Sequence, residues 1–395
     1  MFPNVQENTG SKLIESTGSL FFGKCEAAYS AEKYSLLLEL FVSKMDVLYG
    51  KASNDQDLEC AINIICHLVR RIHSPGMVDS AALLSQAIAA EPKSRADRRL
   101  QALVNLYNVV LDTQAKLVVL LQTLQFSKAS GLADVMLGVV RAHVDSWPNE
   151  LSLTPSDERK LYVTCADALK SCTRKPRTAA KESYRLLCKY LATWEGSTPQ
   201  EASGAVEVSS QVVSDFIRSP DMFQFDLAGN PAIAALKENS KYSPLHQLMT
   251  IYLGGGVADF EKFAETNKAF FKESLGITSE AAFSKMRLLA LMGLAYGAKE
   301  LSFASIASNL NVSPSEVEAL VVQAIGKKLI EARIDQLKEE VVIGKCAARA
   351  FGTEQWKELQ IQLRSWQKSV GDVLELGRDE KGVLAKGIAE LSVSA

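Results

Sequence analysis

Apolar residues recur with a helical period along most of the chain, from about residue 24 to residue 300. One clear example places Leu100, Leu103, Tyr107 and Val110 on a single helix face. Proline- and glycine-containing breaks such as Ser74–Gly76, Trp147–Asn149 and Gly254–Gly256 separate these segments at short intervals. No sequence period repeats from segment to segment. The pattern therefore predicts a mostly α protein, built as a degenerate array of antiparallel helices with short connections.

The period changes between residues 302 and 345. Ser302 is placed to cap a short helix that carries Phe303, Ile306 and Leu310 on one face. The run Ser313–Glu316 then reads as a capping box with proline at the first helical position. Beyond Leu329, apolar residues alternate with charged ones, and a polar turn leads into Val341–Ile343. Two helices followed by two short strands are typical of a winged helix.

A further helix is expected after this module. Its apolar residues advance by alternating steps of three and four, as in a coiled-coil seam: Trp356, Leu359, Leu363, Trp366, Val370 and Val373. One interpretation is that this seam packs back on its own winged helix. The other is that it joins helices of other chains in a bundle, with tryptophans as anchors. Leu384, Ile388 and Leu391 indicate a further amphipathic segment beyond Gly382.

These patterns divide the chain into four parts. We expect a loose N-terminal arm at 1–23, a helical-repeat region at 24–200, and a second domain at 201–349. That domain comprises a helical part at 201–300 and the winged helix at 301–349, and a helical tail follows at 350–395. The stretch Glu195–Gly204 is the best internal boundary by composition.

Charge argues against DNA reading by the winged helix. From Leu301 to Cys346 the chain has five basic and six acidic side chains, a net charge of −1. The start of the second helix carries Glu316 and Glu318, where a recognition helix would meet phosphates and base edges. The whole chain of 395 residues has a net charge of −2, so no overall field draws it to nucleic acid. We therefore expect no specific DNA partner.

Other patterns point to an intracellular protein that does not enter membranes. The apolar run Leu117–Leu124 is too short to span a bilayer, and the first twenty residues lack a secretory pattern. The seven cysteines are scattered and form no CxxC pair, which is typical of reduced thiols that fill core space.

One local charge cluster stands out. Between residues 174 and 189 only Glu182 opposes six basic side chains: Arg174, Lys175, Arg177, Lys181, Arg185 and Lys189. Such a cluster can contact RNA phosphates or an acidic partner. The alternative is a solvated helix face without a partner.

Nothing in the sequence indicates catalysis. His67 and His73 lie six residues apart, so they point in different directions on a helix, and His143 and His246 have no nearby cysteine or acidic cluster that resembles a ligand set. Gly254–Gly256 lacks the Gly-Lys-Ser/Thr of a phosphate loop and is better explained as a helix stop followed by a turn. We expect no metal, no cofactor and no enzymatic activity.

Three stretches together resemble the PCI-domain family: KMRLLALMGLAYGAKELSFASIASNL, VEALVVQAIGKKLIEARIDQLKEEVVI and AFGTEQWKELQIQLRSWQKSV. They cover about residues 283–374, and QALVNLYNVV and RKLYVTCADALK are more weakly similar. This family includes subunits of the proteasome lid, the COP9 signalosome and eukaryotic translation initiation factor 3. The sequences of the three stretches are most similar to those of the initiation factor. The resemblance implies a right-handed helical-repeat array followed by a winged-helix (PCI) module and a C-terminal helix, in a non-catalytic cytoplasmic subunit.

The resemblance also implies partners. PCI winged helices line up side by side, and the C-terminal helices of several subunits gather into a bundle. Carried onto this chain, the implied partner-binding residues are Ile330, Ile334, Val341 and Ile343 of the strands, with Val341–Ile343 as an open strand edge, and Trp356, Leu359, Leu363 and Trp366 of the seam. The implied partners are other PCI and MPN subunits of initiation factor 3, and through them the small ribosomal subunit, to which messenger RNA and initiator tRNA are recruited.

Two other functions stay open at this point. The chain could be a PCI subunit of the COP9 signalosome or the proteasome lid, with the same fold in a different assembly. It could also be a winged-helix regulator that binds nucleic acid. The acidic residues in the second helix argue against this function.

Overall fold

The computed structural model describes residues 19–51, 55–73, 76–198, 200–349 and 353–393. It divides into two compact units, an N-terminal unit, Met1–Thr193, and a C-terminal unit, Trp194–Ala395. The compositional boundary predicted at Glu195–Gly204 lies beside this division.

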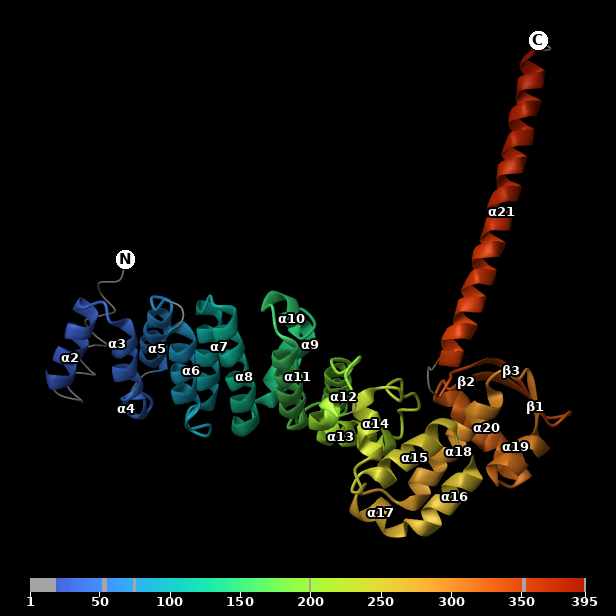
Figure 1. Ribbon diagram of the computed structural model, residues 1–395, viewed down its shortest axis with the longest axis horizontal. Coiled ribbons are helices and arrows are strands. Elements are labelled where there is room, and N and C mark those ends of the chain that lie inside the picture. Colours follow the sequence, from blue (N-terminus) through green and yellow to red (C-terminus); the bar gives the residue numbers. More distant parts are fainter. Residues whose placement is uncertain (1–18, 52–54, 74–75, 199, 350–352, 394–395) are drawn as a thin grey trace. The chain divides into compact units, whose positions relative to one another are not determined.

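The N-terminal unit is helical throughout its described residues (Figure 1). Its elements are α2 (Ser19–Ser30), α3 (Tyr34–Val42), α4 (Met45–Lys51), α5 (Asp55–Val69), α6 (Gly76–Ala89), α7 (Ala96–Val109), α8 (Thr113–Ser130), α9 (Ala133–His143), α10 (Trp147–Glu150), α11 (Pro155–Lys170) and α12 (Pro176–Ala192). Because α2 begins at Ser19, the prediction of a loose arm is wrong for Ser19 to Gly23, and the rest of that arm lies outside the described residues.

Capping residues set the ends of these helices, and several helices pack on the second one along the chain as well as on their neighbours. The Asp112 carboxylate accepts a hydrogen bond of 2.9 Å from the backbone N–H of Ala115 and so caps α8. Gly131 ends the same helix in the left-handed conformation that glycine favours. Helices α5 and α7 pack together, as do α6 and α8, with residues such as Leu103 and Leu120 buried between them. The helical-repeat prediction is therefore confirmed.

The C-terminal unit begins with a helical part built around α18. Its elements are η1 (Glu201–Ala205), α13 (Val206–Arg218), α14 (Pro231–Ala234), η2 (Ala235–Lys237), α15 (Ser243–Gly254), α16 (Val257–Thr266), α17 (Lys268–Glu273) and α18 (Ser279–Ala295). As its nearly continuous apolar circumference predicts, α18 is buried by neighbours that include α15, α16 and α19. An aromatic cluster that includes Phe216, Tyr252 and Phe260 fills the space beside it.

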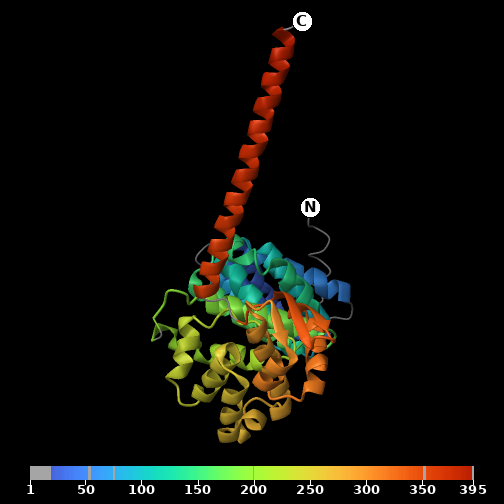
Figure 2. The same cartoon turned by 90° about the vertical axis from the view of Figure 1, so that its right-hand side faces the viewer.

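A winged helix follows, and it has one strand more than predicted. Its elements are β1 (Glu300–Ser302), α19 (Phe303–Leu310), α20 (Pro314–Gly326), β2 (Ile330–Asp335) and β3 (Glu340–Cys346). The antiparallel sheet has the order β1-β3-β2, and Figure 2 shows its orange strands side by side. The strand that was not predicted is β1, in which Leu301 pairs with Val341. These residues are forty positions apart, and a local sequence pattern cannot indicate such a pairing.

The helix caps of this module agree with prediction. The Ser302 hydroxyl accepts a hydrogen bond of 3.3 Å from the Ser305 backbone N–H. The Glu316 carboxylate accepts one of 3.3 Å from the Ser313 backbone N–H, completing the reciprocal arm of the capping box. Asn311 lies between the helices in the left-handed conformation, with φ of 50°, and ends α19.

Replacement of the Ser302 cap tests how far this local chemistry holds the winged helix. Ser302→Ala should lower the free energy of unfolding by about 1 kcal/mol, since the Ser305 N–H loses its acceptor. Ser302→Asp should restore most of the loss, because aspartate caps as well and suits the positive end of the helix. Urea unfolding of the three proteins measures the effect, and equal stability of all three would contradict it.

The chain continues in α21 (Thr353–Val393), a single helix of 41 residues. It is unbroken in both views (Figures 1 and 2). At 1.5 Å per residue it is roughly 60 Å long. The segment predicted beyond Gly382 is thus a continuation of the same helix. The order of helical array, winged helix and C-terminal helix confirms the predicted mostly α fold class.

Candidate interaction sites

The strand candidates divide into two buried and two partly exposed residues. Ile330 and Val341 expose only 2% and 1% of their surface, and their strands pack on helices: β2 packs on α20 and β3 packs on α18. Ile334 and Ile343 are half-buried. The expectation of an open edge at Val341–Ile343 is wrong, because β3 is the central strand and is paired on both sides. The edges of this sheet are β1 and β2.

The seam candidates lie on the exposed surface of α21. Leu363 is 51% exposed and Trp366 is 63% exposed, while Leu359 is half-buried. Trp356, Val370 and Val373 are exposed as well. Over the side chains described on this helix, residues 355–375, the seam does not fold back on its own winged helix. The structure therefore leaves an apolar stripe uncovered in the isolated chain.

The first turns of α21 contact the C-terminal unit at Tyr296, the residue that follows α18. The Tyr296 hydroxyl donates a hydrogen bond of 2.5 Å to the Glu358 carboxylate. This bond to the carboxylate raises the pKa of the Tyr296 phenol, with a smaller effect of its partial burial. The contact attaches the base of the helix while its seam stays exposed further along.

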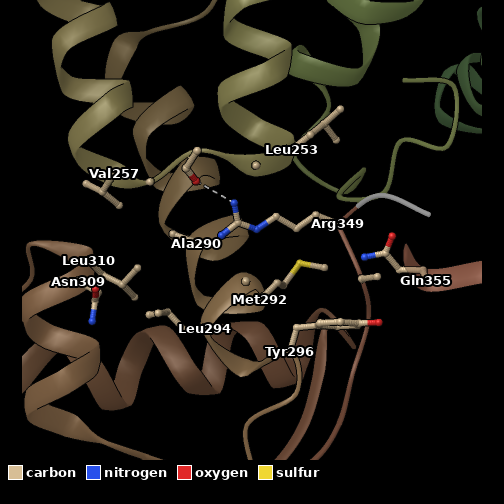
Figure 3. Close-up of a pocket in the computed structure, with 15 residues that line it drawn as sticks. Leu253, Val257, Ala290, Met292, Leu294, Tyr296, Asn309, Leu310, Arg349 and Gln355 are labelled. Carbon is tan, nitrogen blue, oxygen red and sulfur yellow. Dashed lines mark hydrogen bonds between the residues drawn. The ribbon is translucent and has the colours of Figure 1, made fainter. Parts of the chain in front are cut away.

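A pocket of about 470 Å³ lies near this attachment (Figure 3). Its described lining includes Gly254–Gly256, Gly293, Tyr296, Arg349 and Gln355. As predicted, Gly254–Gly256 is a helix stop and a turn: α15 ends at Gly254 and α16 begins at Val257. Gly255 has to be glycine, because a Cβ there would stand 2.9 Å from the Ile251 carbonyl oxygen.

Arg349 supplies the charge of this pocket. Its guanidinium donates a hydrogen bond of 3.0 Å to the Gly255 carbonyl and lies against Gly293, where any side chain would collide with it. Burial lowers the pKa of Arg349 to about 10, so the group stays protonated at neutral pH. Among the described lining residues there is no carboxylate, histidine, cysteine or lysine. The Arg349 guanidinium thus joins the segment after β3 to the turn between α15 and α16.

The basic cluster is split by the structure into two groups. Arg185 contacts Asp145 at 3.1 Å and Glu182 at 2.9 Å, and Lys189 also pairs with Asp145. Hydrogen bonds from Lys189 and then Arg185 hold the pKa of Asp145 below its usual value. The other four, Arg174, Lys175, Arg177 and Lys181, are exposed around the start of α12.

Lys285 is a buried charged residue that the sequence pattern did not indicate. It lies in α18 with only 5% of its surface exposed. Its ammonium donates hydrogen bonds to the Phe216 carbonyl and, at 2.7 Å, to the Ser219 carbonyl, at the end of α13. The ring of Phe216 lies 4.4 Å from the same ammonium. The only signal in the sequence is a lysine within an otherwise apolar helix, and such a lysine usually extends its ammonium to solvent.

No helix in the described part of the chain is both long enough and apolar enough to cross a membrane. The same residues contain no cluster of three histidine, cysteine or acidic side chains suited to a metal ion.

Comparison with known proteins matches the two C-terminal features separately. A model of the PCI domain matches residues 263–345, and a model described as eIF3 subunit M, C-terminal helix, matches residues 349–375. The second match covers the exposed seam of α21.

Similar whole proteins carry the same name. The chain is 28% identical over 326 residues to eukaryotic translation initiation factor 3 subunit M of Gallus gallus, covering 81% of this chain and 83% of the relative. It is 27% identical over 324 residues to that of Homo sapiens, and 28% over 325 residues to that of Danio rerio, with 81% of this chain covered in both cases and 83% and 82% of those relatives. The resemblance drawn from the sequence is confirmed: the chain matches the PCI-domain model over residues 263–345 and is similar over most of its length to subunit M of eukaryotic translation initiation factor 3.

Proposed function

We propose that this chain is a non-catalytic scaffold subunit of the eukaryotic translation initiation factor 3 complex. In this role it assembles with other PCI and MPN subunits through its winged helix and α21. The complex then supports recruitment of messenger RNA and initiator tRNA to the small ribosomal subunit, and we expect the chain in the cytoplasm. The similarity to subunit M proteins supports the choice of complex.

The exposed seam of α21 is the observation that carries this proposal. Full burial of a leucine- or valine-sized side chain stabilises an interface by about 1.5–3 kcal/mol. Leu363, Trp366, Val370 and Val373 are each more than half exposed in the isolated chain, so most of this gain is still available. The alternating spacing of three and four suits a partner that is itself a helix. Helices from neighbouring subunits meet this requirement.

The winged helix contributes through protein contacts in this proposal. Its two sheet edges, β1 and β2, keep backbone groups that a neighbouring strand can pair with. Lys327, one of the two basic residues at the end of α20, donates to the Pro220 carbonyl at 3.0 Å and pairs with Asp221 at 2.9 Å. This pairing removes a cation that DNA binding would need. The contacts of Ile334 and Ile343 with a partner belong to the same proposal.

Purification of the tagged chain from cell extract, with identification of its companions, tests the assembly. We expect the other subunits of initiation factor 3 to co-purify, and a fraction of the chain to sediment with the small ribosomal subunit. Recovery of signalosome or proteasome-lid subunits instead would replace the proposal by the alternative with the same fold. A chain recovered alone would overturn both.

A further inference from the structure

We propose that the start of α12 is a binding surface for the phosphate backbone of RNA, formed by Arg174, Lys175, Arg177 and Lys181. This surface belongs to the N-terminal unit, whereas the seam that carries the assembly proposal belongs to the C-terminal unit. The two proposals therefore stand or fall separately.

Charge compensation distinguishes these four residues from their neighbours. Arg185 and Lys189, further along α12, are held by Asp145 and Glu182. Lys175, Arg177 and Lys181 are exposed and form no ion pair with any described residue. Positive charge thus accumulates at one end of the helix and is cancelled at the other.

Asp134, an acidic residue that contacts the start of this surface, is already engaged in hydrogen bonds. Asp134 accepts hydrogen bonds from the backbone N–H of Arg174 at 3.0 Å and from the Thr173 hydroxyl at 3.1 Å. These bonds, with the nearby Arg174 charge, lower the pKa of Asp134 although desolvation opposes them. Asp134 therefore fixes the turn into α12 and leaves the side chains of Lys175, Arg177 and Lys181 available.

The direction of α12 increases the positive potential. The first turn of this helix of 17 residues contains no acidic residue, and Lys175 at its N-cap makes no side-chain cap. The positive end of the helix dipole and uncapped N–H groups thus add to the surrounding cations. An anion at this surface would relieve the repulsion among these groups.

The chemistry of the surface favours a phosphate backbone over an acidic protein. The exposed residues between 173 and 181 are the four cations, Thr173, Pro176 and Ala180. A protein interface is expected to offer aromatic or large aliphatic side chains at its centre, and this stretch exposes none. Sequence-specific RNA recognition usually adds aromatic side chains that stack on bases and amides that bond to base edges, and this stretch contains no aromatic, asparagine or glutamine residue. We therefore expect binding that depends on salt and is indifferent to base sequence.

Charge reversal in the full-length chain tests this surface. Arg177→Glu/Lys181→Glu removes two contacts, and the glutamate near the start of α12 suits the helix dipole, so the helix should stay folded. The control is Lys268→Glu/Lys272→Glu, which makes the same charge change at an exposed pair of α17 with the same spacing. A short fluorescein-labelled RNA hairpin serves as the probe, and its anisotropy is followed between about 50 and 200 mM salt.

The expected results are specific. Wild-type chain and control should bind equally, with log affinity falling against log salt at a slope of roughly −3 for four phosphate contacts. The α12 variant should bind at least about tenfold more weakly at the lower salt, and its slope should be shallower by about 2. If the control binds RNA as weakly as the α12 variant, the loss of affinity comes from net charge alone and the proposal is wrong. An absence of wild-type binding would also overturn it, as would equally strong, variant-sensitive binding of polyglutamate, which would indicate an acidic protein instead.

Discussion

The double substitution Leu363→Asp/Trp366→Asp should release the chain from its complex, with affinity for its partners falling by more than about a hundredfold. Both residues lie on the seam of α21, and both are more than half exposed in the isolated chain. In a bundle, each aspartate would lose the apolar contacts of the side chain it replaces. Each would also require burial of a carboxylate without a partner, which costs several kcal/mol. These two penalties act together.

The substitution should leave the PCI domain folded. Exposed substitutions usually change the free energy of unfolding by less than about 0.5 kcal/mol. The matched control is Ser365→Asp/Lys368→Gln, which shifts net charge by the same amount on the other side of α21, where both residues are exposed. Co-purification of companion subunits measures the effect, and urea unfolding verifies the fold. Full recovery of companions with the seam variant would show that the seam is not an interface.

Stability of the C-terminal unit should rise with pH because of Lys285. Burial, and secondly the nearby charge of Lys327, lower the pKa of Lys285 from 10.5 to about 7. Between these values the unfolded chain binds one proton more than the folded chain, so increasing pH favours folding. Relative to Lys285→Met, the wild-type free energy of unfolding should gain about 1.4 kcal/mol per pH unit in that range. Below pH 7 Lys285 is protonated in both the folded and the unfolded chain, so this slope should disappear.

Urea unfolding at several pH values measures this difference. Amide hydrogen exchange of α18 across the urea series reports on the C-terminal unit, to which this helix belongs. Subtraction of the variant removes titrations common to both proteins, such as that of Cys346, whose pKa is raised by burial. Lys327→Met removes the second cause and should move the rise in stability to higher pH. Identical pH profiles of wild type and Lys285→Met would contradict a buried, titrating lysine.

Features governed by neighbouring residues could be predicted from the sequence. The Ser302 cap and the Ser313–Glu316 arrangement join groups only three residues apart, so their geometry follows from composition and spacing. The burial of α18 follows from its nearly continuous apolar surface. The spacing of the α21 seam likewise identified which side chains would share one face.

Features decided by distant contacts could not be predicted. Strand β1 exists because Leu301 meets Val341, and β3 is central because two other strands reach it. For the same reason, the sequence did not indicate that Lys189 and Arg185 pair with Asp145, about forty residues away. The predicted positive charge of the basic cluster was therefore too high. The burial of Lys285 could not be predicted either, because its acceptors, the carbonyls of Phe216 and Ser219, lie at the end of α13, more than sixty residues away.

The uncovered stripe on α21 makes surplus copies of this protein vulnerable. An orphan copy carries Leu363, Trp366, Val370 and Val373 in water, and such stretches attract chaperones and proteases or promote aggregation. Cellular abundance should consequently follow that of its companions, and overproduction alone should yield rapid turnover rather than accumulation.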